Sequence, residues 1–189
     1  MIPTLPLAPR NRLAEVILAA LHDAGARREL AALAAGGPEA AGWLGDAERA
    51  HAPLLAARAA SASAALASRP LGRAARTLAA RLDDAAALWD ARCFFEVHEL
   101  LEPAWRVAEG EARETLQGLV QAAVGYQHLA NGNLHGARAL LAEAGARLHG
   151  RRLGGAELEP FARALARSSE DLDHFDWTAV PALPGAGPD

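Results

Sequence analysis

The sequence contains no lysine, so all 19 of its lysine-plus-arginine positions are arginines. A chain without lysine cannot form a Schiff base through a lysine amine, and it cannot build the phosphate-binding loop that depends on a lysine. Cysteine occurs once, at Cys93, so no disulfide can form within the chain. A single cysteine is typical of proteins in a reducing compartment, and we expect a cytoplasmic location.

Long apolar runs are also absent. No uninterrupted apolar stretch approaches the roughly 20 residues that a membrane helix requires, so no membrane association is expected. The formal net charge of −4 gives no electrostatic reason to expect a nucleic acid as partner. The chain has neither a Gly-x-Ser-x-Gly nor a Gly-x-Gly-x-x-Gly motif, which removes the commonest signatures of hydrolases and of dinucleotide-binding proteins.

The residue that the sequence has in excess is alanine. Hydrophobic residues make up 51% of the chain and aromatic residues only 5%, and alanine is the best helix former. This composition predicts an all-α fold, a compact multi-helix bundle with antiparallel helix hairpins. We expect a single helical domain over residues 1–189, in which residues 1–80 form an N-terminal helical extension. The prolines at positions 3, 6 and 9 predict that residues 1–10 are extended.

The best-defined pattern lies in residues 93–149, which we interpret as three helices, preceded by an amphipathic helix over 73–92. Gly110 separates the first helix from the second. A turn at Asn131-Gly132-Asn133 separates the second from the third, with Gly132 in the left-handed conformation and Asn133 as the N-cap. Pro103 predicts a kink or a new helix start within the first helix. A further helix is expected over 157–172.

The first of these three helices carries three chargeable side chains close together, His98, Glu99 and Glu102. Successive helical residues are rotated by about 100°, which places the three within an arc of roughly 120° on one face. That face also carries Phe95, Trp105 and Arg106. Large aromatic residues are unusual on a solvent face and paired carboxylates are unusual in a core, so the face predicts a partly buried polar pocket.

The second helix carries a stripe of residues with helical spacing, most of them polar: Glu114, Gln117, Gln121, Val124 and His128. An antiparallel pair that turns near Gly110 places this stripe opposite the cluster. We therefore predict that Gln117 and Gln121, together with Trp105 and Arg106, line a site for a cofactor or small ligand. Gly118, Ala122 and Gly125 are small and lie on neighbouring rows, so we expect them to let the backbones of this pair approach closely.

The spacing of the cluster indicates metal chemistry. His98 and Glu102 are four residues apart on one helix, so both side chains can bind one divalent ion such as zinc, iron or manganese, with His128 as a third ligand. In a metal-dependent enzyme, Glu99 would be the candidate general base. The sequence does not decide whether the protein is an enzyme.

The same residues also fit a structural polar network without a metal. Glu102 lies four residues before Arg106, an orientation that favours an ion pair, and a protonated His98 can pair with Glu102. The protein would then be a non-enzymatic binding or scaffolding module, and its alanine-rich helices could form a homo-oligomer.

The segment from Phe95 to Glu102, followed by Trp105 and Arg106, resembles the signature of the family called domain of unknown function 309. That family is described by a histidine, three residues, a glutamate, two residues and an aromatic residue, which here are His98, Glu102 and Trp105. The resemblance covers a motif core over residues 85–149. It implies an all-α fold and a suspected metal-binding role for His98 and Glu102, without an assigned activity.

Overall fold

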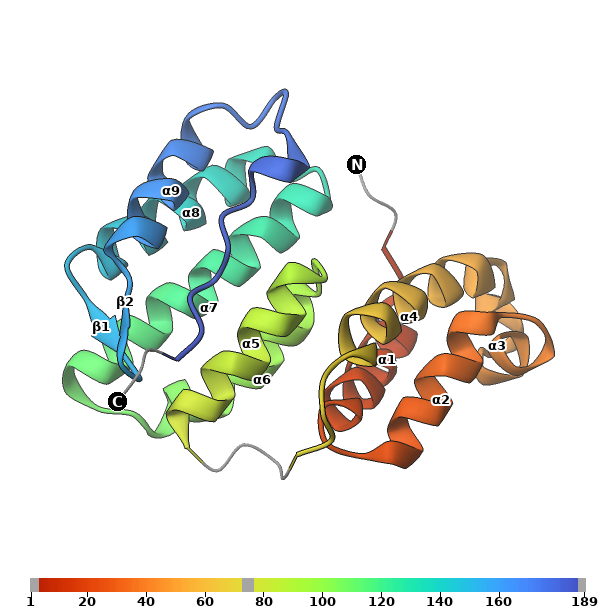
Figure 1. The fold of residues 1–189 in the computed structure, drawn as a ribbon. Helices are drawn as coiled ribbons and strands as arrows, with labels where there is room; N and C mark the ends of the chain where they lie inside the picture. The colour runs from red at the N-terminus through yellow and green to blue at the C-terminus, as the bar shows by residue number, and fades with distance from the viewer. Residues whose placement is uncertain (1–3, 73–76, 187–189) are drawn as a thin grey trace. The chain divides into compact units, whose positions relative to one another are not determined.

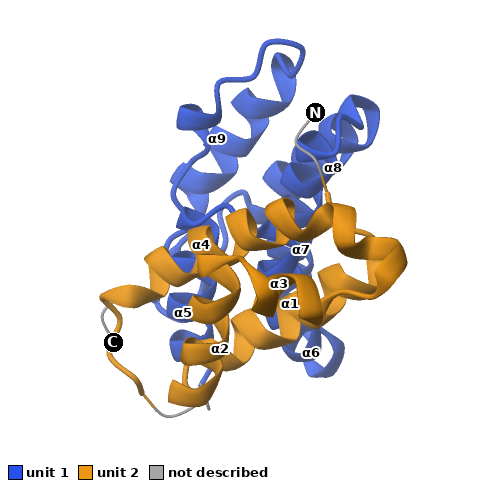
Figure 2. Cartoon of the chain, turned by 90° about the vertical axis from the view of Figure 1, so that its right-hand side faces the viewer, with its two compact units in different colours: residues 1–2, 75–189 blue, residues 3–74 orange. Residues whose placement is uncertain are grey.

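The computed structural model describes residues 4–72 and 77–186. These residues fall into two compact units that meet in sequence near residue 75 (Figure 2). The predicted all-α fold is confirmed, because α-helices account for the regular structure apart from two short 3-10 helices and one two-residue-per-strand hairpin in the described ranges. The single domain with an N-terminal extension over residues 1–80 stays a prediction.

The N-terminal unit (unit 2 in Figure 2) contains four α-helices within residues 4–72, namely α1 (Leu7–Ala20), α2 (Ala24–Ala35), α3 (Pro38–Trp43) and α4 (Ala52–Ala67), with a 3-10 helix at Asp46–His51 before α4. Their core consists of Leu13, Ile17, Leu30, Leu55 and Leu66, each at most 1% exposed. The small alanines Ala59 and Ala62 on α4 are fully buried as well, which shows how an alanine-rich chain packs helices closely.

The start of α1 corrects the expectation that residues 1–10 are extended. The helix begins at Leu7, and Pro9 lies within its first turn. A proline is tolerated there because the first N–H groups of a helix have no partner inside the helix. Residues 1–3, including Pro3, lie outside the described part of the chain.

The C-terminal unit (unit 1 in Figure 2) contains the candidate site. Its helices are α5 (Leu78–Asp90), α6 (Phe94–Val107), α7 (Gly110–Ala130), α8 (Leu134–Leu148) and α9 (Glu159–Glu170), and a 3-10 helix, η2, spans Trp177–Ala179 (Figure 1). The three helices predicted over 93–149 are α6, α7 and α8. Thr77 caps α5, whose predicted start at residues 73–76 lies outside the described residues.

The hairpin of α7 and α8 follows the predicted turn. Gly132 has a φ of 77°, and the Asn133 side chain accepts a hydrogen bond from the Gly136 N–H at 3.0 Å. Gly118 and Gly125 face α8 and not α6, which corrects the prediction: a Cβ at Gly118 would lie 2.8 Å from the Leu148 side chain, and one at Gly125 would lie 2.9 Å from Leu141. Leucine side chains of α8 therefore pack directly against the α7 backbone at these two glycines.

An aromatic cluster forms the centre of this unit. Trp89 is fully buried and makes edge-to-face contacts with Phe94, Tyr126 and Phe161, at ring-centroid distances of 5.1, 5.4 and 5.4 Å. The segment after α9 returns along α5 (Figure 1) and is held there by hydrogen bonds from Trp89 Nε1 to the Pro181 carbonyl (2.7 Å) and from the Ala186 N–H to Asp83 (2.8 Å).

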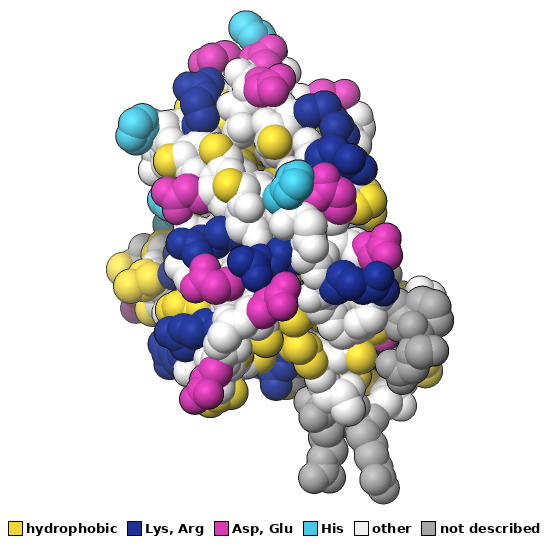
Figure 3. Space-filling view, turned by 90° about the vertical axis from the view of Figure 1, so that its left-hand side faces the viewer, with side chains coloured by type: hydrophobic (Ala, Val, Ile, Leu, Met, Phe, Trp, Pro, Cys, Tyr) yellow, Lys and Arg dark blue, Asp and Glu magenta, His cyan; other side chains and the backbone are white. Residues whose placement is uncertain are grey.

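A small hairpin that was not predicted lies between α8 and α9. In it, β1 (Arg152–Leu153) pairs antiparallel with β2 (Ala156–Glu157). Gly154 and Gly155 form its turn with φ values of 54° and 78°. The arginines just before and in the hairpin are paired with acids: Arg147 with Glu114, Arg151 with Glu111 and Arg152 with Glu157. Basic and acidic side chains are correspondingly interspersed on the face in Figure 3.

None of the helices within residues 4–72 and 77–186 combines the length and the apolar character that crossing a bilayer would require. Cys93 is buried, as expected for a structural thiol.

Candidate metal centre on helix α6

Helix α6 has a buried face and a half-buried polar face. Phe94, Val97 and Leu101 are at most 2% exposed and anchor the helix in the core. His98, Glu99 and Glu102 lie on the other face, which is partly accessible to solvent. The sequence pattern thus fixes the rotation of α6, and that rotation brings the three chargeable side chains out of the core together.

The three side chains converge. One potential ligand atom from each of His98, Glu99 and Glu102 lies within 4.8 Å of the others. His98 Nδ1 is 3.1 Å from Glu99 Oε1, and the side chains of His98 and Glu99 are 24% and 38% exposed. One imidazole and two carboxylates form a donor set that suits zinc, iron or manganese, so the residues present fit a divalent metal ion.

The contact between His98 and Glu99 determines which ring nitrogen is free. An ionised carboxylate only accepts hydrogen bonds, so Nδ1 of His98 must carry the proton that it donates to Glu99. In the neutral ring, the lone pair then lies on Nε2. A carboxylate that holds the protonated nitrogen of a metal-binding histidine is a recurrent arrangement, because it orients the ring and raises its basicity.

Glu102 already has a partner. Arg106 Nη2 donates to Glu102 Oε1 at 2.9 Å, with exposed fractions of 67% for the arginine side chain and 25% for the glutamate. The predicted pair four residues apart is therefore present. An exposed pair of this kind contributes only about 0.3–0.5 kcal/mol, so it presents a small barrier to a cation that competes for Glu102.

Pro103 interrupts the hydrogen bonding of α6 without starting a new helix. The helix runs from Phe94 to Val107 in one span, so of the two predicted alternatives the new helix start is wrong and the kink stays a prediction. Arginines from other helices supply donors along it: Arg81 donates to the Leu100 carbonyl at 2.7 Å, and Arg113 donates to the Trp105 carbonyl at 3.0 Å. These contacts hold the helix on both sides of Pro103.

Trp105, the aromatic residue of the motif, packs beneath a cation. The guanidinium of Arg113 lies 4.8 Å from the centroid of the Trp105 ring. Its indole Nε1 is buried and has no hydrogen-bond partner among the described residues, and the same holds for Oε1 of Gln121. Buried polar atoms are almost always paired in proteins, so each of these atoms has capacity to bind a water or a ligand atom.

The described contacts of the polar stripe of α7 are not with His98, Glu99 or Glu102. Gln121 donates to Glu143 of α8 at 2.7 Å, and Glu114 pairs with Arg147 of α8. His128 Nδ1 lies 3.0 Å from Asn133 Nδ2. Because Asn133 uses its oxygen for the Gly136 N–H, it donates to His128, which leaves only Nε2 of that histidine for any further role.

The structure therefore brings together His98, Glu99 and Glu102, with Arg106 beside Glu102. It does not include His128 in that group, and Gln117 is half-buried on α7. The roles predicted for Gln117, Gln121, Trp105, Arg106 and His128 as ligand-binding or metal-binding residues stay predictions.

Two buried acids were not predicted from the sequence. Glu96 on α6 is 1% exposed and Asp84 on α5 is 2% exposed, and neither is without an interaction partner. A helical wheel contains no signal for Glu96, because this residue lies about 100–160° from Phe94, Val97 and Leu101, the core residues of α6.

Comparison with known protein families agrees with the motif. Residues 82–140 match the model of the domain of unknown function DUF309. The match confirms the resemblance drawn from the motif, and it contains α6 and α7 in full. No curated protein matches the chain, and no solved structure does. The DUF309 region thus includes His98, Glu99 and Glu102, but its family description assigns no function.

Proposed function

We propose that the DUF309 region of this protein binds a divalent transition metal ion through His98 and Glu102. The observation that carries the proposal is the convergence of potential ligand atoms from His98, Glu99 and Glu102 within 4.8 Å. Zinc, iron and manganese all accept an imidazole with carboxylates. We also propose that the protein is cytoplasmic, since its one cysteine fits a reducing compartment.

Within this proposal Glu99 is a positioning residue. Its carboxylate holds Nδ1 of His98 and thereby directs Nε2 toward a ligand. With so few protein ligands, the remaining coordination positions would be taken by water, which a bound metal ion acidifies. A role for Glu99 as general base, and hence an enzymatic activity, requires that its carboxylate leaves His98.

The first experiment is calorimetric titration of chelator-treated protein with Zn²⁺ and Mn²⁺, followed by thermal unfolding. A metal at about 100 times its dissociation constant stabilises the native state by about 2.7 kcal/mol, which corresponds to roughly 5–10 °C in Tm for a chain of this size. His98→Ala and Glu102→Gln should abolish the effect. His135→Ala is the matched control, because His135 is exposed and outside the cluster. Equal titration curves for wild type and His98→Ala would refute the proposal.

A second candidate function is favoured by the ion pair between Arg106 and Glu102, which needs no metal. In that case the cluster stabilises α6 and the protein is a binding or scaffolding module, with self-association through its alanine-rich helices. Arg106→Gln separates the two candidates. If a metal competes with Arg106 for Glu102, this variant binds the metal more tightly, by up to about twofold. If the cluster is only structural, the variant loses stability and binds no metal.

A further inference from the structure

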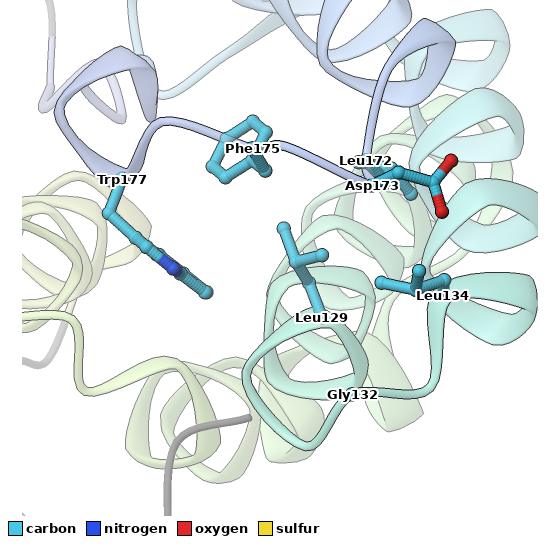
Figure 4. A pocket seen from close by; sticks show the side chains of 7 residues that line it. All are labelled: Leu129, Gly132, Leu134, Leu172, Asp173, Phe175 and Trp177. Atoms are coloured by element: carbon cyan, nitrogen blue, oxygen red, sulfur yellow. The ribbon is translucent and has the colours of Figure 1, made fainter.

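A cavity of about 390 Å³ lies in the C-terminal unit, between the turn that joins α7 to α8 and the segment that follows α9. Figure 4 shows its seven lining residues, Leu129, Gly132, Leu134, Leu172, Asp173, Phe175 and Trp177. Leu129 and Phe175 point toward one another in this view, with Trp177 on one side and Asp173 on the other. The volume falls in the range of small-molecule sites.

The aromatic wall of the cavity is held in place from outside. Phe175 and Trp177 pack edge to face at 5.5 Å, and Phe175 also contacts the buried Tyr126 ring at 5.9 Å. Arg92 donates to the Trp177 carbonyl at 2.9 Å, and Asp176 accepts from the Thr178 N–H at 2.9 Å. A ligand would therefore meet rings that are already positioned, which lowers the entropic cost of binding.

The charge of the lining is one-sided. Among the described residues that line the cavity, Asp173 alone is charged, and the others are apolar or glycine. Asp173 has a loose partner in Arg138, at 3.7 Å, and the two side chains are 65% and 50% exposed. Asp173 lies on the leucine side of the cavity and the rings lie opposite (Figure 4), so the cavity is complementary to an organic cation whose apolar part covers the rings.

We propose that this cavity binds a small protonated amine with an apolar body. The apolar body lies against Phe175 and Trp177, and the ammonium group pairs with Asp173 in place of Arg138. This site is separate from the candidate metal centre on α6, because none of its lining residues belongs to that helix.

The test uses the full chain labelled with ¹⁵N and titrated with 2-phenylethylamine in a two-dimensional NMR experiment. The neutral analogue 2-phenylethanol has the same apolar body and no charge. We expect saturable shifts of the Trp177 indole N–H and the Gly132 amide, with the amine bound about threefold more tightly than the alcohol, the gain expected for one exposed ion pair.

Two substitutions of opposite sign sharpen the test. Asp173→Asn should weaken amine binding by about threefold and leave alcohol binding unchanged, so retained alcohol binding shows that the cavity is intact. Arg138→Gln should tighten amine binding by up to about twofold, because it removes the competing cation. Asp171→Asn is the matched control, since Asp171 is exposed and lines a different cavity. Equal affinities for amine and alcohol, an unchanged Asp173→Asn variant, or the absence of saturable shifts would overturn the proposal.

Discussion

At the scale of single residues, the environment of a side chain decides its chemistry more than its type does. Glu99 and Glu102 are both half-buried on α6, yet one holds a histidine ring and the other an arginine. The helical wheel predicted that the two carboxylates share a face with His98. The spacing of four residues also predicted the pair of Glu102 with Arg106. His98 was predicted to pair with Glu102 and instead contacts Glu99, because spacing alone does not set the rotamer of a long side chain.

Tyr126 provides a prediction at this scale. It is the only tyrosine in the chain, and burial raises the pKa of its hydroxyl to about 12, although its hydrogen bond to Ser168 and the charge of Arg92 oppose the shift. The folded state therefore favours the protonated phenol. Its contribution to stability is complete below pH 10, the ordinary pKa, and is lost as the pH rises to about 12.

The loss should amount to about 3 kcal/mol in the free energy of unfolding, since each pKa unit corresponds to about 1.4 kcal/mol. Urea unfolding at a series of alkaline pH values measures it, and ultraviolet absorbance reports the appearance of tyrosinate. Tyr126→Phe should show a flatter dependence on pH in the same range. A dependence as steep as in the wild type would assign the effect to other groups.

At the scale of elements, the helical spacing of apolar residues predicted most of the helices, and glycine, asparagine and proline residues predicted several of their ends. The turn at Asn131-Gly132-Asn133 and the helix over 157–172, observed as Glu159–Glu170, are confirmed. The start of α1 was wrong because proline acts as a helix breaker only beyond the first turn. The β1–β2 hairpin is too short to produce an alternating pattern.

The orientation of α7 was predicted less well than its existence. The spacing of Gln121 and Glu114 showed that they share a stripe, but a wheel does not tell which neighbouring helix a stripe approaches. Their described partners belong to α8, and the glycines Gly118 and Gly125 also face α8. Which neighbour a helical face meets depends on tertiary packing, which a single sequence does not encode as a local pattern.

The close approach of α7 and α8 leads to a second prediction. Gly125→Ala introduces a Cβ 2.9 Å from the Leu141 side chain, so we expect a loss of about 1–3 kcal/mol in the free energy of unfolding from overpacking. Gly42→Ala in α3 is the control. A Cβ there meets no atom within 4 Å, and the change should stabilise the protein by about 0.4–1 kcal/mol. Urea unfolding of both variants gives the comparison, and an unchanged Gly125→Ala would contradict the packing argument.

At the scale of the whole molecule, composition and the absence of long apolar runs were sufficient to predict an all-α protein. The return of the segment after α9 along α5 was not predicted. It depends on contacts between residues far apart in the chain, such as Trp89 with Pro181. Such pairs have no fixed spacing that a sequence pattern could reveal.

The returning segment can be tested by substitution. Leu183 is 5% exposed, so Leu183→Ala should reduce the free energy of unfolding by about 2–4 kcal/mol. Leu7→Ala removes the same atoms from a side chain that is 66% exposed, and its effect should stay within about 0.5 kcal/mol. Chemical denaturation distinguishes the two variants. If Leu183→Ala reduced the free energy of unfolding no more than Leu7→Ala does, the segment would add nothing to the core.

The hydrogen bonds that hold this segment have a common property. Trp89 and Arg92 donate to the carbonyls of Pro181 and Trp177, and Asp83 accepts from the N–H of Ala186. The side chains of α5 and of the α5–α6 turn thus bind main-chain atoms of the returning segment. These hydrogen bonds do not depend on the side chain at each of those positions. The exposed positions between 178 and 186 should therefore tolerate substitution, unlike the buried Val180 and Leu183, whereas the insertion or deletion of a single residue would shift every later donor and acceptor out of place.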